Sequence, residues 1–157
     1  MADTRVQLEV EDWVRREWLP AKLGERFSRE RIKLSPGGVF DFDAVSADFS
    51  IVANISTSSA RTASDKLAVG KLMKLRSDMY FLLLAACKRR FVVLTDRTMF
   101  ELCQKERDSG RVPESIEFLH AELPESLRER LRAAQLVASD EVAPARGRGS
   151  PRRTSQA

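Results

Sequence analysis

The chain has 157 residues, of which 43% are hydrophobic and 32% are charged, and its formal net charge is +4. These values are typical of one soluble globular domain, and no apolar run approaches the roughly 20 residues that a membrane-spanning helix needs. The two cysteines lack the spacing of a metal site, so we expect reduced thiols in a cytoplasmic protein.

The first third of the chain predicts one helix followed by strands. Apolar residues recur at helical spacing in "VQLEVEDWVRREWL" (6–19), with Asp3 or Thr4 as the cap and Pro20 ending or kinking the helix. A short strand is expected in "RIKL" (31–34). Two further strands are expected in "VFDFDAV" (39–45) and "SIVANIST" (50–57). Short turns separate these runs, which predicts an antiparallel three-strand meander.

The rest of the chain alternates between helices and strands. Ser64 is expected to cap a long helix over 65–88, and Asp96 a helix over 97–108. Strands are expected at 90–95 and 116–120, and a closing helix at 124–138.

This order predicts an α/β fold with a mixed central sheet that starts with the antiparallel three-strand meander and has helices on both faces. A single domain would cover 1–139. Residues 140–157 would form a disordered, arginine-rich tail whose four arginines and two acidic residues contribute +2 of the net charge.

Three polar residues of the meander share a recognisable spacing. Asp43 lies in "FDAV", and Asn54 and Ser56 lie two residues apart in "IVANIS". The element order and these strands resemble the PD-(D/E)XK nuclease superfamily, which has the restriction-endonuclease-like fold. In that family the second strand carries an aspartate, and the third reads apolar, apolar, Glu, apolar, Lys. Asp43 matches the aspartate, whereas Asn54 stands in the glutamate position and Ser56 in the lysine position.

The resemblance implies a catalytic set that has lost its charges. In the family the two carboxylates bind Mg²⁺ and the lysine supports the attacking water. Asn54 and Ser56 keep the same-face geometry of alternate strand residues without those charges. Mg²⁺ binding is therefore expected to be weak or absent, and little activity should survive.

Catalytic groups migrate in this superfamily, so replacements are conceivable. The metal would then be held by Asp43 together with Asp41, or with Glu17 or Glu11 from the first helix. The catalytic cation would be Lys66 or Lys71, which lie in the predicted long helix. The alternative is that Asp43 has no catalytic or metal-binding role and is an ordinary residue on a solvated sheet face.

Nucleic-acid binding has one local candidate. Basic residues gather at the start of the long helix, where Lys66 and Lys74 are eight apart and share a face: Lys66, Lys71, Lys74 and Arg76. They would contact a phosphate backbone, or else form a solvated helix face. The run "KRR" (88–90) follows a helix end, so a structural role is favoured for it.

Three functions follow from these observations. The first is a catalytically degenerate nuclease-fold domain, a pseudo-enzyme that acts as a DNA-associated or interaction module. The second is an active Mg²⁺-dependent DNA endonuclease with a relocated lysine and carboxylate. The third is a scaffold for a protein partner or a second copy, without nucleic-acid binding.

No membrane partner is expected. The sequence contains no phosphate-binding glycine loop, zinc spacing or nucleophile elbow, so kinase, metalloprotease and serine-hydrolase chemistries have no support.

Overall fold

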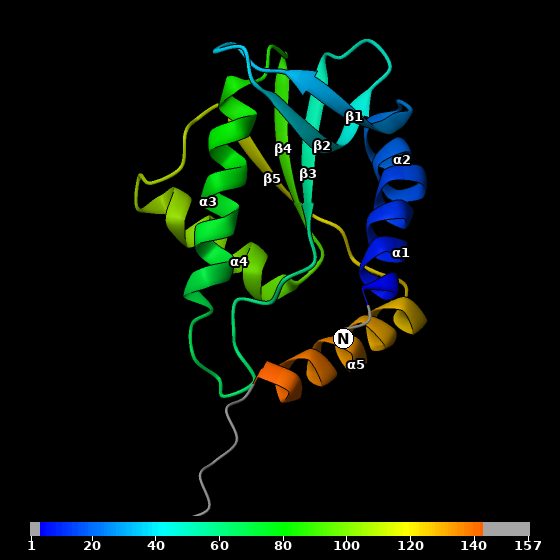
Figure 1. Ribbon diagram of the computed structural model, residues 1–157, viewed down its shortest axis with the longest axis vertical. Helices are drawn as coiled ribbons and strands as arrows, with labels where there is room; N and C mark the ends of the chain where they lie inside the picture. Colours follow the sequence, from blue (N-terminus) through cyan, green and yellow to red (C-terminus); the bar gives the residue numbers. More distant parts are fainter. Residues whose placement is uncertain (1–3, 143–157) are drawn as a thin grey trace, which may run out of the picture.

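The computed structural model describes residues 4–142 as helices on both faces of one sheet (Figure 1). The elements in chain order are α1 (Arg5–Trp13), η1 (Val14–Trp18), α2 (Leu19–Leu23), β1 (Phe27–Lys33), β2 (Val39–Ser46), β3 (Ile51–Ser56), α3 (Val69–Leu84), β4 (Arg89–Leu94), α4 (Arg97–Asp108), β5 (Ile116–His120) and α5 (Glu125–Val142).

The sheet has its strands in the order β1-β2-β3-β4-β5. β1, β2 and β3 are antiparallel neighbours, whereas β4 and β5 join β3 in parallel through the crossover helices α3 and α4. The predicted fold class is therefore confirmed: a mixed sheet that opens with an antiparallel meander.

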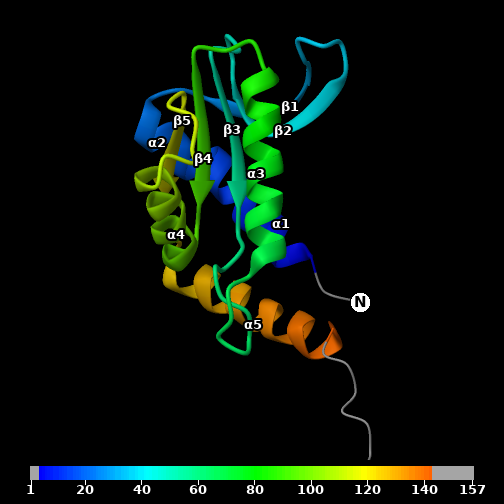
Figure 2. The same ribbon diagram turned by 90° about the vertical axis from the view of Figure 1, so that its left-hand side faces the viewer.

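Two apolar layers hold the helices to the sheet. On one face α3 and α4 pack on side chains such as Phe42, Val52 and Val92. On the other face the α1–η1–α2 helix covers Ala53 and Phe91. α5 crosses the end of the molecule next to α1 (Figures 1 and 2), where it buries a smaller third cluster.

The first helix runs through Pro20 and ends beyond it. Proline has no N–H and its ring clashes with a regular helical carbonyl four residues earlier. The π-helical segment η1 lies directly before it and widens the turn, so the chain continues as α2 to Leu23. Gly24 then ends the helix with a left-handed φ of 73°.

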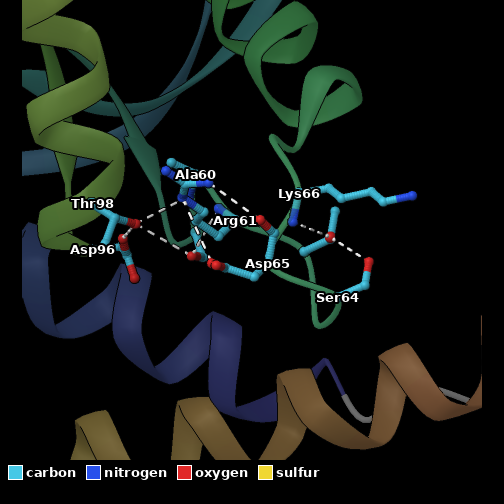
Figure 3. A network of polar contacts seen from close by, with 9 residues as sticks. Ala60, Arg61, Ser64, Asp65, Lys66, Asp96 and Thr98 are labelled. Carbon is cyan, nitrogen blue, oxygen red and sulfur yellow. Dashed lines mark hydrogen bonds and ion pairs between the residues drawn. The ribbon is translucent and has the colours of Figure 1, made fainter.

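The long helix begins later than predicted, at Val69, and Ser64 does not cap it. Residues 58–68 instead form a loop closed by an isolated bridge between Arg61 and Leu67. The backbone N–H of Thr62 donates to the carbonyl of Lys66 at 2.8 Å. Figure 3 shows this loop anchored to the start of α4, where the Thr98 hydroxyl accepts from the N–H of Ala60 at 3.2 Å and donates to Asp96.

The Asp96 cap is confirmed, because its Oδ1 accepts from the N–H of Met99 at 3.1 Å. α5 extends to Val142, past the predicted domain boundary at residue 139. The tail prediction otherwise falls on residues 143–157, which lie outside the described part of the chain.

Within residues 4–142 no helix combines the length and apolarity needed to span a bilayer. Cys87 and Cys103 are both free thiols.

Candidate functional site

A bulge in β2 places Asp43 where β2 and β3 separate. Ser28 of β1 pairs with Val45, but Glu30 pairs with Phe42, so β2 contains one extra residue between these pairs. Regular pairing of β2 with β3 covers only Ala44–Ala53 and Val45–Val52. The two strands therefore part at Asp43, beside the end of β3.

The Asp43 carboxylate replaces a missing backbone partner at this point. Its Oδ2 accepts from the N–H of Ile55 at 2.8 Å, so Asp43 lies against the β3 residue that separates Asn54 from Ser56. The guanidinium of Arg15 in η1 donates to the Asp43 carbonyl at 2.6 Å. We call Asp43, Asn54 and Ser56 the β2–β3 fork. The fold thus brings together the three residues that the sequence singled out.

Asn54 and Ser56 face α3. They pair in parallel register with Val92 and Leu94, both of which belong to the apolar layer under α3 and α4. Asn54 is only 3% exposed, and among the side chains of residues 4–138 its Nδ2 is the one buried nitrogen or oxygen without a hydrogen-bond partner. A buried donor without a partner is costly, typically about 1–3 kcal/mol. The fork therefore contains a polar group that the fold itself does not satisfy.

Charges from three elements act on Asp43. Burial raises the pKa of its carboxyl, while the bond from Ile55 and the cations Arg29, Arg15 and Lys74 lower that pKa again. Arg29 lies on β1 opposite the bulge, and Lys74 comes from the exposed flank of α3. Lys74 is thus the lysine whose charge reaches the fork.

Two further carboxylates lie within electrostatic reach of Asp43. Burial, then the charge of Asp43, raises the pKa of Glu11 in α1. Burial also raises the pKa of Asp78 in α3 to about 6, with Lys74 opposing the rise and Asp43 adding to it. Glu11 was one of the carboxylates considered from the sequence. Asp78 was missed, although its position four residues after Lys74 put both on one helix flank.

Neither of the other two predicted metal ligands, Asp41 and Glu17, acts on the Asp43 carboxyl. Asp41 is held by Arg31 on the exposed side of the β1–β2 hairpin, with Nε and Oδ1 2.9 Å apart. That ion pair lowers the pKa of Asp41, mainly through the hydrogen bond. Glu17 is exposed in η1 and is not among the groups whose charges shift the Asp43 carboxyl.

The four residues of the predicted basic cluster do not form one surface: one lies in a loop, and the others lie on α3 with different partners. Lys66 lies in the loop before α3, and Figure 3 shows its side chain extending away from the other labelled residues. The prediction that Lys66 and Lys74 share a helix face is therefore wrong, because the helix starts after Lys66. Lys71 is exposed in the first turn of α3, three residues before Lys74. Arg76 is paired with Glu106 of α4 at 3.0 Å.

A divalent ion such as Mg²⁺ requires several oxygen ligands with free lone pairs. Among residues 4–138, whose side chains the structure describes, no group of three or more Asp, Glu, His or Cys side chains is arranged to hold a metal ion. One oxygen of Asp43 already accepts from Ile55, and Asp41 is paired with Arg31. The predicted set of Asp43, Asp41 and Glu17 therefore does not fit a Mg²⁺ site in this structure.

The ionisation of Asp78 makes the free energy of unfolding depend on pH. Its folded-state pKa of about 6 lies above its ordinary value of 3.8, so the folded protein binds the proton more tightly. The free energy of unfolding should therefore fall as the pH rises from about 4 to about 6, and stay lowered above that. Asp78→Asn should be more stable than the wild type at about pH 7, by about 1–2 kcal/mol after allowance for solvent screening of a half-buried group.

Urea unfolding at several pH values measures this effect. The advantage of Asp78→Asn should vanish near pH 4, whereas Asp108→Asn, at an exposed carboxylate of α4, should show no such trend. An advantage that stays constant with pH would show that burial of the Asp78 charge is not its source.

Comparisons of the chain with models of known protein families, with curated proteins and with solved structures found no match. The nuclease resemblance thus stays a prediction, which rests on the element order and on the residues of the fork.

Proposed function

We propose that this protein is a catalytically degenerate nuclease-fold domain, which binds nucleic acid around the β2–β3 fork but does not hydrolyse it efficiently. The observation that carries the proposal is the chemistry of the fork itself. Asp43 stands where two strands part, and the neighbouring positions that would hold a carboxylate and an ammonium hold Asn54 and Ser56. Phosphodiester hydrolysis depends on such charges to stabilise the transition state.

The cations around the fork support the binding part of the proposal. Arg29 and Lys74 both act on Asp43, from opposite sides, and both are exposed. An open groove of about 460 Å³ lies beside α1 and β1, and its lining holds three arginines, Arg5, Arg15 and Arg29, together with three carboxylates, Glu9, Glu11 and Asp12. The groove itself is therefore not basic, and the binding part of the proposal rests on the exposed cations Arg29 and Lys74, since each phosphate that a cation neutralises releases a counterion. Lys71 is also exposed on α3, three residues before Lys74.

A salt titration of DNA binding tests the proposal. The full chain should bind duplex DNA with an affinity that falls steeply as salt rises. Arg29→Gln and Lys74→Gln should each weaken binding for all sequences alike and flatten the salt slope by about 0.9.

Arg97→Gln is the matched control, because Arg97 is an exposed arginine at the start of α4, outside the fork. Binding that is insensitive to salt, or equally weakened by all three substitutions, would contradict the proposal. It would instead favour the scaffold without nucleic-acid binding.

A second function has one observation in its favour. The charge of Asp43 acts on both Glu11 and Asp78, and Lys74 acts on Asp43 and Asp78. Mg²⁺ often takes only one or two carboxylates from a protein. A relocated nuclease site would therefore use Lys74 as its cation, in place of the predicted Lys66 or Lys71.

A plasmid-nicking assay with Mg²⁺ or Mn²⁺ separates the two functions. We expect no nicking by the wild type. Nicking that Asp43→Asn and Lys74→Ala each lower by about 10²–10³, while Lys71→Ala leaves it intact, would establish the relocated site instead.

A further inference from the structure

The turn between β2 and β3 holds a phenylalanine in a backbone conformation that favours glycine. The N–H of Phe49 donates to the carbonyl of Ser46 at 2.9 Å, which closes a tight turn, and Phe49 itself has a φ of 61°. In hairpin turns that end in a left-handed residue, this position is normally glycine. Among the described residues the other non-glycine residue with a positive φ is Asp65. Aspartate is enriched in that region, whereas a bulky residue there is a genuine outlier.

Polar side chains on both sides of Phe49 hold the turn in this shape. Oδ1 of Asp48 accepts from the N–H of Ser50 at 3.0 Å, from the Ser50 hydroxyl at 2.6 Å and from the Ser46 hydroxyl at 2.9 Å. The Ser46 hydroxyl in turn accepts from the N–H of Ile51 at 2.9 Å. The left-handed conformation of Phe49 is therefore imposed by its neighbours and does not depend on its ring.

The fold gains little from the ring of Phe49 to offset this strain. The side chain is 48% exposed and belongs to none of the three apolar clusters. A left-handed conformation costs free energy for every residue that has a Cβ atom. Strained residues of this kind cluster at functional sites, where the surrounding structure holds them in place. The turn therefore presents an aromatic ring to the outside at a cost in stability.

The surroundings of the ring are polar and balanced in charge. The N–H groups of Lys88 and Arg89 both donate to the carbonyl of Ser50, at 2.8 and 3.0 Å, so two exposed cations lie beside the turn. Two carboxylates balance them, since Arg89 is paired with Glu117 and Asp48 lies in the turn itself. A basic field is therefore not what this turn offers to a ligand, and the ring has to provide the contact.

A ring that stands alone among polar groups suits a planar partner with polar edges. The other large apolar side chains that the described chain exposes lie outside this turn. An apolar protein surface needs a cluster of desolvated contacts, which one ring does not provide. A nucleic-acid base needs only the ring, because every base has a π-face that stacks on an exposed aromatic side chain. Inside a duplex both faces of a base are covered by its neighbours, so the base has to be unpaired or terminal.

The turn is close enough to the β2–β3 fork for one nucleic acid to contact both. Ile51 follows the turn, and Ile55 of the same strand is bonded to Asp43 in the fork. Four residues of a strand span about 13 Å. That is about four base-pair steps of B-DNA. A nucleic acid bound at the fork can therefore place a nucleotide a few positions away at Phe49.

We propose that Phe49 is a stacking residue, which takes an unpaired base of the nucleic acid that is bound at the β2–β3 fork. This inference rests on the proposed function and adds to it the kind of nucleic acid. A duplex with a single-stranded end is bound more tightly than a blunt duplex, because only the former offers a free base to the ring of Phe49.

Fluorescence anisotropy of the full chain with two DNAs tests the stacking. One DNA is a blunt duplex, and the other is the same duplex with a single-stranded overhang. Phe49→Gly should weaken binding of the overhang DNA by about tenfold and leave binding of the blunt duplex unchanged. Phe49→Tyr keeps an aromatic ring and should keep the preference. Tyr80→Ala is the matched control, because it removes an exposed ring from α3 and should change neither affinity.

The possible results separate this inference from the proposed function. If Phe49→Gly binds both DNAs as the wild type does, the stacking is overturned and the proposed function stands. If Phe49→Gly weakens both DNAs equally, the ring contacts the backbone and base stacking is contradicted. If the wild type shows no salt-sensitive binding of either DNA, both proposals fall.

Thermal unfolding of Phe49→Gly and Phe49→Ala tests the strain independently of any ligand. Both substitutions remove the ring, so the loss of its buried part is the same in the two variants. The glycine variant should unfold at a temperature about 2–6 °C higher than the alanine variant, because only glycine adopts the left-handed conformation without a penalty. Equal unfolding temperatures would show that this position costs nothing, and would remove the reason for assigning a function to the ring.

Discussion

The Asn54→Glu, Ser56→Lys double variant is expected to nick plasmid DNA in the presence of Mg²⁺, whereas no nicking is expected of the wild type. Both positions face α3 from one strand, and Ile55 between them is bonded to Asp43. The substitutions therefore add a carboxylate and an ammonium beside an existing carboxylate. One well-placed electrostatic group is worth about 10²–10³ in rate, so a gain of about a hundredfold or more over background is expected.

Stability provides a second readout of the same variant. Asn54 is 3% exposed, so a glutamate there is a nearly buried charge next to Asp43, and the metal-free variant should be less stable than the wild type. Bound Mg²⁺ compensates that charge and should raise the unfolding temperature of the variant but not that of the wild type.

The matched control is Asn54→Gln with Ser56→Met, which adds similar bulk without charge. It should neither nick DNA nor respond to Mg²⁺. A folded double variant that binds Mg²⁺ but leaves plasmid intact would show that more than two charges are missing from the fork. Nicking by the control would show that charge at these positions is irrelevant.

The sequence predicted the order and type of the elements well because their signals are local. Strict alternation in β2, the β-branched run of β4 and the Asp96 cap each reflect interactions within a few residues. The start of α3 could not be predicted in this way. Ser64 is a good capping residue, but the segment before α3 is held by contacts with Thr98, nearly forty residues away. Tertiary contacts overrode a local preference there.

The sequence could predict only those residues of the candidate site that lie on β2 and β3. Alternation identified Asp43, Asn54 and Ser56, and the fold brings them together. Arg29 and Lys74 reach Asp43 because of a bulge in β2 and the way α3 packs. A one-residue bulge has no clear signature in "FDFDAVS". The charges that decide the chemistry of the fork come from elements that are neighbours only in three dimensions.

The basic run at 88–90 was given a structural role from its place after a helix, and the contacts of Arg90 explain that role. Its Nε donates to the carbonyl of Leu82 and its Nη2 to the carbonyl of Ala85, both at 2.7 Å. These carbonyls lie at the end of α3, where the helix leaves its last carbonyls short of donors; that of Leu82 also accepts from the N–H of Ala85 at 3.2 Å. A cation at this end also opposes the negative pole of the helix dipole.

Replacing Arg90 by alanine is therefore expected to lower the free energy of unfolding by about 2–3 kcal/mol, because two charge-assisted hydrogen bonds to partly buried carbonyls are lost. Arg90→Lys should recover only part of this loss, since a single ammonium cannot reproduce the two parallel donors of the guanidinium.

Arg89→Ala is the matched control. Arg89 forms an exposed ion pair with Glu117 at 3.2 Å and lies over Phe91, contacts worth about 1 kcal/mol together. Urea unfolding measures all three variants. A loss for Arg90→Ala no larger than that for Arg89→Ala would mean that the end of α3 does not depend on this side chain.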